Sequence, residues 1–289
     1  SFSSTVSHLV YYDQEIVIAF HDSINGWSWV DSSGWIDSWS WNVWEFELDN
    51  NDNLIMNAYV KQDSTDERNF SIQSFSTLGK SWAKNIILDT QMDLDVYQLL
   101  MDIEGTNIHL FAPTYEDLEI GGQVINCPTN ADNLACHIWI TLDINGAISS
   151  SISKPYVGVL PTTFSVRQGA AYISGGAEGG GRGGAHNFTG TPTSFGNENM
   201  YAFSTVLNSN GAWGYLLSWP IDDNMEEWPT QYNTFVHANG SVSQIIHQEQ
   251  YTAGNLVFNG VQIGMMHNAN IQKTIVTFDS MGTYKMHQT

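Results

Sequence analysis

The fold is decided by the stretch Leu207-Asn-Ser-Asn-Gly-Ala-Trp213, the clearest of five segments of one kind. In each segment a polar residue ends an apolar run, and a glycine follows three positions later. The other four are Val30-Asp-Ser-Ser-Gly34, Phe75-Ser-Thr-Leu-Gly79, Leu142-Asp-Ile-Asn-Gly146 and Phe278-Asp-Ser-Met-Gly282. Asp, Asn or Ser can cap a turn with its side chain, and glycine takes the positive φ that closes it. Each segment therefore predicts a tight β-hairpin.

A second kind of hairpin alternates with the first along the chain. It consists of an apolar strand, an acidic or polar turn and another apolar strand. The examples are His8–Phe20, Phe46–Met56, Leu100–Phe111 and Phe164–Ile173. One hairpin of each kind gives a unit of four antiparallel strands and about 45–70 residues, the size of one β-propeller blade.

The whole chain shows almost no helical periodicity, and short runs rich in Val, Ile, Tyr, Phe and Trp recur from end to end. We therefore predict one all-β domain over 1–289, a β-propeller of about five to six four-stranded blades. An irregular β-sandwich or β-solenoid is the alternative. The blades that the pattern places are 7–43, 44–92, 95–155 and 164–219. After them, three hairpins stand where two are expected, which leaves the blade number open.

Some of these hairpins resemble the repeats of secreted prokaryotic β-propeller proteins. The likeness is carried by Leu48-Asp-Asn-Asn-Asp-Asn-Leu54 and by Leu207–Trp213, and Phe75–Trp82 is similar to the Asp-box of sialidase-like propellers. The chain departs from these patterns at Asp52, where the repeat has glycine, and at Thr77, where the Asp-box has Asp. The resemblance implies a propeller fold and no particular activity, since propellers host many functions.

Charge limits the classes of partner. The chain has 30 Asp and Glu against 9 Lys and Arg, a formal net charge of −21, although only 13% of its residues are charged. Phosphate backbones and anionic membrane surfaces are held by clustered Lys and Arg, so neither nucleic acid nor such a surface is an expected partner. No apolar stretch reaches the roughly 18 residues that a membrane-spanning helix needs.

The two cysteines, Cys127 and Cys136, enclose a Pro-, Asn- and Asp-containing loop that one disulfide can close. Zinc is the alternative, but it would need two more ligands from elsewhere. Three Asn-x-Ser/Thr triplets make Asn69, Asn187 and Asn239 candidate glycosylation sites. Together these features predict a secreted protein that is extracellular or bound to the cell surface.

Six of the eleven tryptophans lie within 27–44. They are Trp27, Trp29, Trp35, Trp39, Trp41 and Trp44. Because residues two apart in a strand share a face, Trp27 with Trp29 and Trp39 with Trp41 would form a cross-strand aromatic ladder on the first blade. The ladder could pack one blade against the next, or it could stack sugar rings, with Asp31 and Asp37 as hydrogen-bonding neighbours.

One acidic turn carries oxygen ligands at alternate positions, as calcium loops do. Asp49, Asn51 and Asn53 are the candidate ligands, although the distal Glu of an EF-hand is missing. A plain hairpin turn explains the same residues. Calcium is the single cofactor that the sequence suggests.

Signatures of catalysis are missing from the sequence. There is no Gly-x-Ser-x-Gly elbow and no His-Glu-x-x-His motif. The three arginines, Arg68, Arg167 and Arg182, do not form the cluster that a sialidase-type site needs. A pair of carboxylates for glycoside cleavage stays open, but no pattern singles out two of them.

These observations favour three functions, in this order of preference. The first is a non-catalytic extracellular protein that acts in self-assembly or adhesion, as a surface or filament subunit with copies of itself as partners. The second is a carbohydrate-binding propeller that uses the tryptophan cluster. The third is a propeller-type glycosidase or lyase.

Overall fold

The computed structural model describes most of the chain, and every element in the described residues is a β-strand. The described ranges are 6–12, 15–22, 26–35, 45–61, 68–76, 78–87, 99–114, 117–127, 136–155, 159–178, 200–221, 233–250, 254–258, 261–266 and 270–288. The chain forms two compact units, Ser1–Pro155 and Tyr156–Thr289. The predicted all-β class is confirmed.

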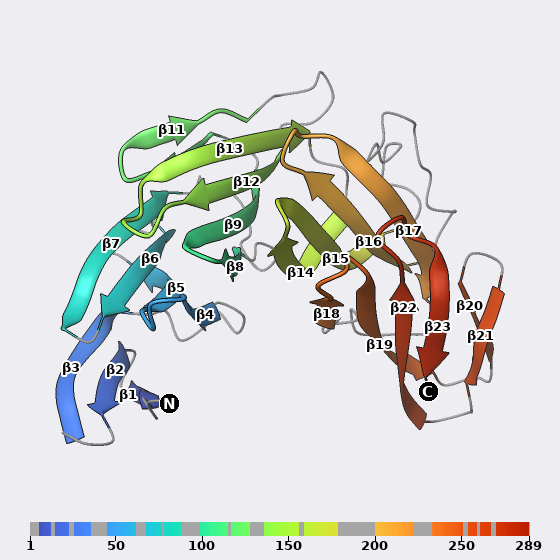
Figure 1. The fold of residues 1–289 in the computed structure, drawn as a ribbon, viewed down its shortest axis with the longest axis horizontal. Coiled ribbons are helices and arrows are strands. Elements are labelled where there is room, and N and C mark those ends of the chain that lie inside the picture. The colour runs from blue at the N-terminus through green and yellow to red at the C-terminus, as the bar shows by residue number, and fades with distance from the viewer. Residues whose placement is uncertain are drawn as a thin grey trace. The chain divides into compact units, whose positions relative to one another are not determined.

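Three sheets make up the first unit (Figure 1). Sheet I contains β1 (Val6–Tyr12), β2 (Glu15–Asp22) and β3 (Gly26–Trp35). Sheet II contains β4 (Glu45–Leu48), β5 (Leu54–Lys61), β6 (Arg68–Ser76) and β7 (Gly79–Ile87), extended beyond β7 by β10 (Leu118–Ile120) and β11 (Gln123–Ile125). Sheet III contains β8 (Leu100–Glu104), β9 (Asn107–Thr114), β12 (Cys136–Leu142) and β13 (Ile148–Pro155).

Two four-stranded sheets and one hairpin make up the second unit. Sheet IV contains β14 (Val159–Arg167), β15 (Ala170–Glu178), β16 (Met200–Asn208) and β17 (Trp213–Ile221). Sheet V contains β18 (Asn233–Val236), β19 (Val242–Gln250), β22 (Asn270–Phe278) and β23 (Tyr284–Gln288). The hairpin is β20 (Gly254–Phe258) with β21 (Val261–Met266).

The strand order repeats with a period of ten strands. In each unit a meander of four strands, sheet II or sheet IV, precedes a sheet whose second and third strands are separated by an inserted hairpin. The inserted hairpins are β10–β11 and β20–β21. The second of these is the surplus hairpin that the sequence pattern left unexplained. Antiparallel sheets of four strands, as predicted, fit a propeller-like or a sandwich architecture.

Four of the five predicted turns form as turn chemistry requires, whereas the turn predicted at Val30–Gly34 is wrong, because these residues lie within the single strand β3 and pair with β2. At the β12–β13 turn, the Asp143 carboxylate accepts hydrogen bonds from the backbone N–H groups of Asn145 and Ala147, at 2.8 and 2.9 Å, and Gly146 has a φ of 76°. Asp279 accepts equivalent bonds at the β22–β23 turn. At Asp52 the non-glycine residue takes the glycine conformation, with a φ of 61°. Asp tolerates this left-handed region better than most residues, which explains that departure from the repeat pattern.

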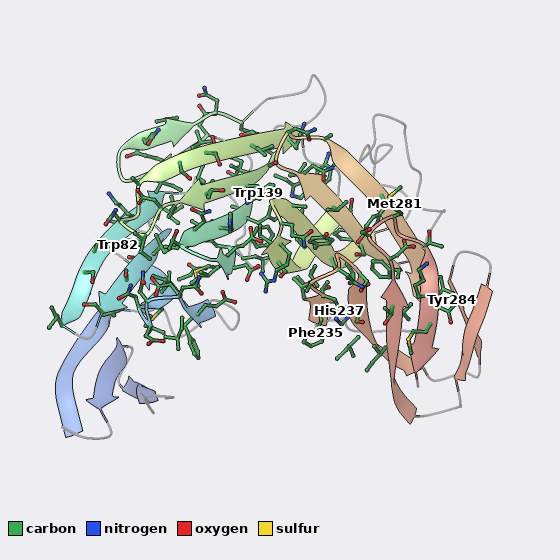
Figure 2. All side chains as sticks on the ribbon, viewed as in Figure 1. Trp82, Trp139, Phe235, His237, Met281 and Tyr284 are labelled. Atoms are coloured by element: carbon green, nitrogen blue, oxygen red, sulfur yellow. A yellow bond between two sulfur atoms is a disulfide. The ribbon has the colours of Figure 1, made fainter. Side chains whose placement is uncertain are left out.

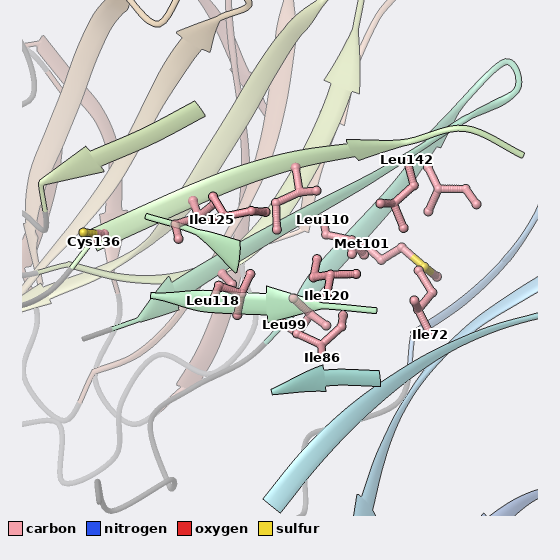
Figure 3. Packing of buried hydrophobic residues seen from close by; sticks show 14 of the residues in the cluster. Ile72, Ile86, Leu99, Met101, Leu110, Leu118, Ile120, Ile125, Cys136 and Leu142 are labelled. Carbon is pink, nitrogen blue, oxygen red and sulfur yellow. The ribbon is translucent and has the colours of Figure 1, made fainter. Parts of the chain in front are cut away.

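A continuous apolar core joins sheets II and III within the first unit (Figure 3). Strands β5 to β12 contribute to it, so the inserted hairpin β10–β11 is part of the core and covers one side of it. Its members are Ile55, Ile72, Ile86, Leu99, Met101, Ile108, Leu110, Ala112, Leu118, Ile120, Ile125, Cys127, Cys136, Ile138, Ile140 and Leu142.

Neighbouring sheets also meet through an aromatic ring that covers a turn glycine. In the first unit, Trp82 on β7 lies over Gly146, where an added Cβ would be 2.9 Å from the ring, and its Nε1 donates to the Ile144 carbonyl oxygen at 2.8 Å. In the second unit, Tyr215 on β17 covers Gly282 with the same spacing of 2.9 Å. This aromatic-on-glycine contact joins sheet II to sheet III and sheet IV to sheet V.

Candidate functional site

The outward face of sheet V is exposed although it carries apolar side chains. Strand residues alternate between two faces, and Val242, Val276 and Phe278 on the inner face are buried. On the outer face the exposed fractions are 53% for Phe235 and 56% for Met286. Figure 2 shows Phe235 and His237 close together at the end of β18. A sheet face of this kind normally packs against another layer.

One row of side chains crosses all four strands of this face. Phe235 pairs with Ser243, Ser243 pairs with Thr277, and Thr277 pairs with Met286. The register therefore places two hydroxyl groups between an aromatic ring and a thioether. We call this face, with Phe235, Ser243, Thr277 and Met286 as its row, the open face of sheet V.

A groove of about 470 Å³ lies on the open face. It is lined by His237, Ala238, Asn239, Ser241, Ser243, Thr277 and Met286. His237 Nε2 and Ser243 Oγ are 2.8 Å apart, and Ser243 Oγ and Thr277 Oγ1 are also 2.8 Å apart. These three groups form a hydrogen-bonded chain that can both donate to and accept from an incoming group. The lining contains no Asp, Glu, Lys or Arg, so the groove suits an uncharged occupant.

Two groups of the groove, Ser243 and His237, are of types that occur in catalytic sites. Ser243 and His237 are within the distance that a nucleophile and its base need. A catalytic histidine also needs a group that orients its second nitrogen, and no described residue forms a hydrogen bond with His237 Nδ1. Paired carboxylates for glycoside cleavage are absent from the groove lining.

Met286 occupies the position from which the aromatic-on-glycine contact is made in sheets II and IV. Tyr215 and Met286 each follow their turn glycine by four residues, and Trp82 follows Gly79 by three. Trp82 and Met286 are each the first paired residue after a register shift next to the turn, and Tyr215 lies within the corresponding shift. Trp82 and Tyr215 cover a glycine of the next sheet, whereas Met286 stays exposed. The open face therefore repeats a packing surface without the sheet that such a surface contacts elsewhere.

The predicted tryptophan cluster can be placed only in part. Trp27, Trp29, Asp31 and Trp35 belong to β3, which pairs with β2, with register shifts between Phe20 and His21 and between Glu15 and Val17. The other predicted members, Trp39, Trp41, Trp44 and Asp37, lie outside the described residues. Sugar stacking by this cluster stays a prediction.

At the predicted calcium site, the carboxylate takes part in a hairpin turn. Asp49 is buried, and its Oδ1 accepts from the backbone N–H groups of Asn51 and Asn53, both at 2.8 Å. Its Oδ2 accepts from Asn53 Nδ2 at 2.8 Å. These bonds account for both carboxylate oxygens and favour the plain-turn interpretation. Calcium at Asp49, Asn51 and Asn53 stays a prediction.

The predicted disulfide between Cys127 and Cys136 is present, with a Cα–Cα distance of 5.7 Å. Of the three sequons, Asn69 lies within β6, between β5 and β7. Asn187 lies outside the described residues. Asn239 is exposed in the β18–β19 turn, where its Oδ1 accepts from the Ser241 N–H and hydroxyl at 3.0 and 2.6 Å. Asn239 is thus the sequon whose exposure is described.

Metal sites and membrane-spanning helices are considered next, for the ranges that the structure describes. No three His, Cys, Asp or Glu side chains there are grouped so that they could hold a metal ion. No helix within those ranges has the length and apolar character needed to cross a membrane.

Sequence reasoning missed the groove. Phe235, His237 and Asn239 stand at alternate positions, which was a signal that they share one side of the hairpin. Ser243, Thr277 and Met286 gave no signal, because only the pairing of β19, β22 and β23 brings them together.

Comparison with known proteins gives little likeness. No protein-family model matches the chain. No curated protein matches it either. Among solved structures, the chain is similar to the polysaccharide lyase Uly1, with 8% sequence identity and a TM-score of 0.33. The alignment covers 94% of this chain and 55% of that one, so the chain spans about half the length of the lyase. A likeness of this degree supports no conclusion about function.

Proposed function

We propose that this protein is a non-catalytic extracellular subunit that assembles with copies of itself, as a surface or filament component. The observation that carries the proposal is the open face of sheet V, which exposes the position that packs against another sheet elsewhere in the fold. A second copy would supply the missing layer.

Burial of this face can drive association. Fully burying one large apolar side chain contributes about 1.5–3 kcal/mol. Phe235 and Met286 are each more than half exposed, and Ile275 beside them is 39% exposed. Phe235 and Met286 lie on the two outer strands of sheet V, so a partner that covers the whole row would bury both side chains.

Charge and chemistry are compatible with this contact. The net charge of −21 makes copies repel one another at long range. At the open face, however, the groove lining is uncharged, and Asp279 forms an ion pair with Lys285 at 2.9 Å on the same sheet. The disulfide is typical of proteins in an oxidising compartment, which supports the extracellular setting.

Light scattering at increasing protein concentration, in low and high salt, tests the proposal. We expect assembly that strengthens with salt, because salt screens the repulsion between acidic copies. Phe235→Asp should keep the protein monomeric. Phe46→Asp is the matched control, since Phe46 lies on terminal strand β4 with a similar exposed fraction of 54%. A wild-type protein that stays monomeric at high concentration and high salt would falsify the proposal.

A second candidate function is adhesion to a neutral glycan at the same groove. It is favoured by the hydrogen-bonded chain of His237, Ser243 and Thr277 beside the exposed ring of Phe235, because sugars present hydroxyl groups and an apolar ring face. Calorimetric titration with cellohexaose, mannohexaose and laminarihexaose tests it. Binding that is lost in Ser243→Ala and unchanged in Phe46→Asp would favour adhesion over self-assembly.

A further inference from the structure

We infer that the element that covers the open face is the β6–β7 turn of a second copy, with Leu78 entering the groove and Gly79 lying against Met286. This inference rests on the proposed self-assembly and names the two surfaces that meet.

Leu78 is the first observation. It is a large apolar side chain at the tip of a turn, and it is 94% exposed. The turn holds it there, because Leu78 N donates to Ser76 Oγ at 3.2 Å and Ser76 Oγ donates to the Gly79 carbonyl oxygen at 3.3 Å. The equivalent position holds Asn145 and Asn210 in two other turns and the exposed Met281 in a third. An apolar side chain held at the tip of a turn can contact an apolar partner.

Gly79 is the second observation. Gly146 and Gly282 belong to turns of the same kind, and each is covered by an aromatic ring. Among the described residues, no heavy atom would lie within 4 Å of a Cβ added at Gly79. The β6–β7 turn therefore has a bare glycine, whereas the open face has a covering residue, Met286, without a glycine. The two are the halves of one contact that is complete elsewhere in the fold.

Size and polarity agree with this pairing. A groove of about 470 Å³ has ample room for one leucine side chain. Leu78 would pack against Met286, and the polar backbone of the turn would face the hydroxyls of Ser243 and Thr277. The groove lining and the turn residues Leu78 and Gly79 carry no charge. The contact therefore adds no repulsion to the long-range repulsion between copies.

The symmetry of the assembly follows from this choice. The turn and the open face are different surfaces, so one contact leaves a free open face on one copy and a free turn on the other. Two reciprocal contacts between the same two copies would close a two-fold dimer, and contacts that continue to further copies would produce rings or open filaments.

Cysteine cross-linking tests the contact directly. Leu78→Cys and Met286→Cys are prepared as separate proteins, mixed and oxidised. The two native cysteines are already bonded to each other, so they do not compete. We expect a cross-linked dimer on a non-reducing gel in the mixture and only trace amounts in either protein alone. Asn210→Cys mixed with Met286→Cys is the matched control, because Asn210 holds the equivalent turn position in sheet IV.

A second measurement avoids cysteine chemistry. We expect Leu78→Asp to weaken assembly by roughly ten-fold or more, from the loss of one buried leucine, and Leu78→Met to preserve it. Assembly without the cross-link, and unchanged in Leu78→Asp, would overturn this inference and leave the proposed function standing. A cross-link that forms within monomers of the Leu78→Cys, Met286→Cys double variant would also overturn it. A monomeric wild-type protein would remove the proposed function as well.

Discussion

Substitution of Gly146 by alanine should destabilise the first unit by about 2–5 kcal/mol. Two costs add up to this figure. Gly146 has a φ of 76°, a conformation that costs an L-residue about 1–2 kcal/mol. The new Cβ would also lie 2.9 Å from Trp82 Cε3 and 3.0 Å from Cζ3, so the ring must move. Overpacking of that kind costs about 1–3 kcal/mol.

Urea unfolding followed by far-UV circular dichroism measures the loss. Gly122→Ala is the matched control, because Gly122 has a φ of 85° in the same unit but no heavy atom within 4 Å of an added Cβ. The unfolding free energy that Gly122→Ala loses reports the backbone cost alone. The difference between the two variants is the cost of displacing Trp82.

A double variant completes the experiment. Once Trp82 is alanine, the Gly146→Ala substitution meets no ring and should cost only what Gly122→Ala costs. The two substitutions should therefore be strongly non-additive, as expected for residues in contact. Equal losses for Gly146→Ala and Gly122→Ala would refute the claim that the aromatic-on-glycine contact joins sheets II and III.

Three further outcomes are expected. Replacing Cys127 and Cys136 together by serine should cost about 2–3 kcal/mol in calorimetric unfolding, since the disulfide closes a short loop; an unchanged melting temperature would contradict this. Burial lowers the pKa of His137, which is stacked on Phe111, to about 3, so the stability that depends on its neutral form is complete above pH 6.5 and is lost as the pH falls towards 3. His137→Phe should flatten this part of the pH dependence of stability. The same acid sensitivity in both proteins would count against this assignment. The hydrogen bond from Lys285, followed by those from backbone N–H groups, lowers the pKa of Asp279 to about 2. The ionised carboxylate therefore contributes to stability above pH 3.8, and this contribution is lost as the pH falls through 2. Asp279→Asn should abolish this pH dependence, as NMR titration of the β22–β23 turn can show.

The hairpin turns could be predicted from sequence because turn chemistry is local. Asp143 and Gly146 are three residues apart, and the bonds that they make lie within the turn itself. The same locality explains why sheets II, III and IV begin and end within a few residues of the predicted blades. The inserted hairpins could not be placed in this way. Whether β10–β11 joins β7 depends on pairing across about 30 residues of chain, which no local pattern encodes.

The candidate site was beyond local reasoning for a related reason. Ser243 and Thr277 look like ordinary strand residues until the register puts them side by side. Exposure of Met286 depends on whether another layer packs on sheet V, and not on the residues next to it in the chain. The tryptophan-rich stretch stands out by composition and so predicts a site, whereas an uncovered packing position has no compositional signal.

The disulfide gives the first unit a mechanical property that the second unit does not share. The hairpin β10–β11 pairs with β7 at Glu119–Ile87 and Ile120–Ile86 and packs in the core, and tension strong enough to pull it from the core would peel open this short ladder. Cys127 follows that hairpin and is bonded to the first residue of β12 in sheet III. After the ladder opens, the disulfide would keep the hairpin close to β7, and the two could pair again. The chain has no further cysteine to anchor β20–β21, so repeated stretching should disrupt the second unit before the first.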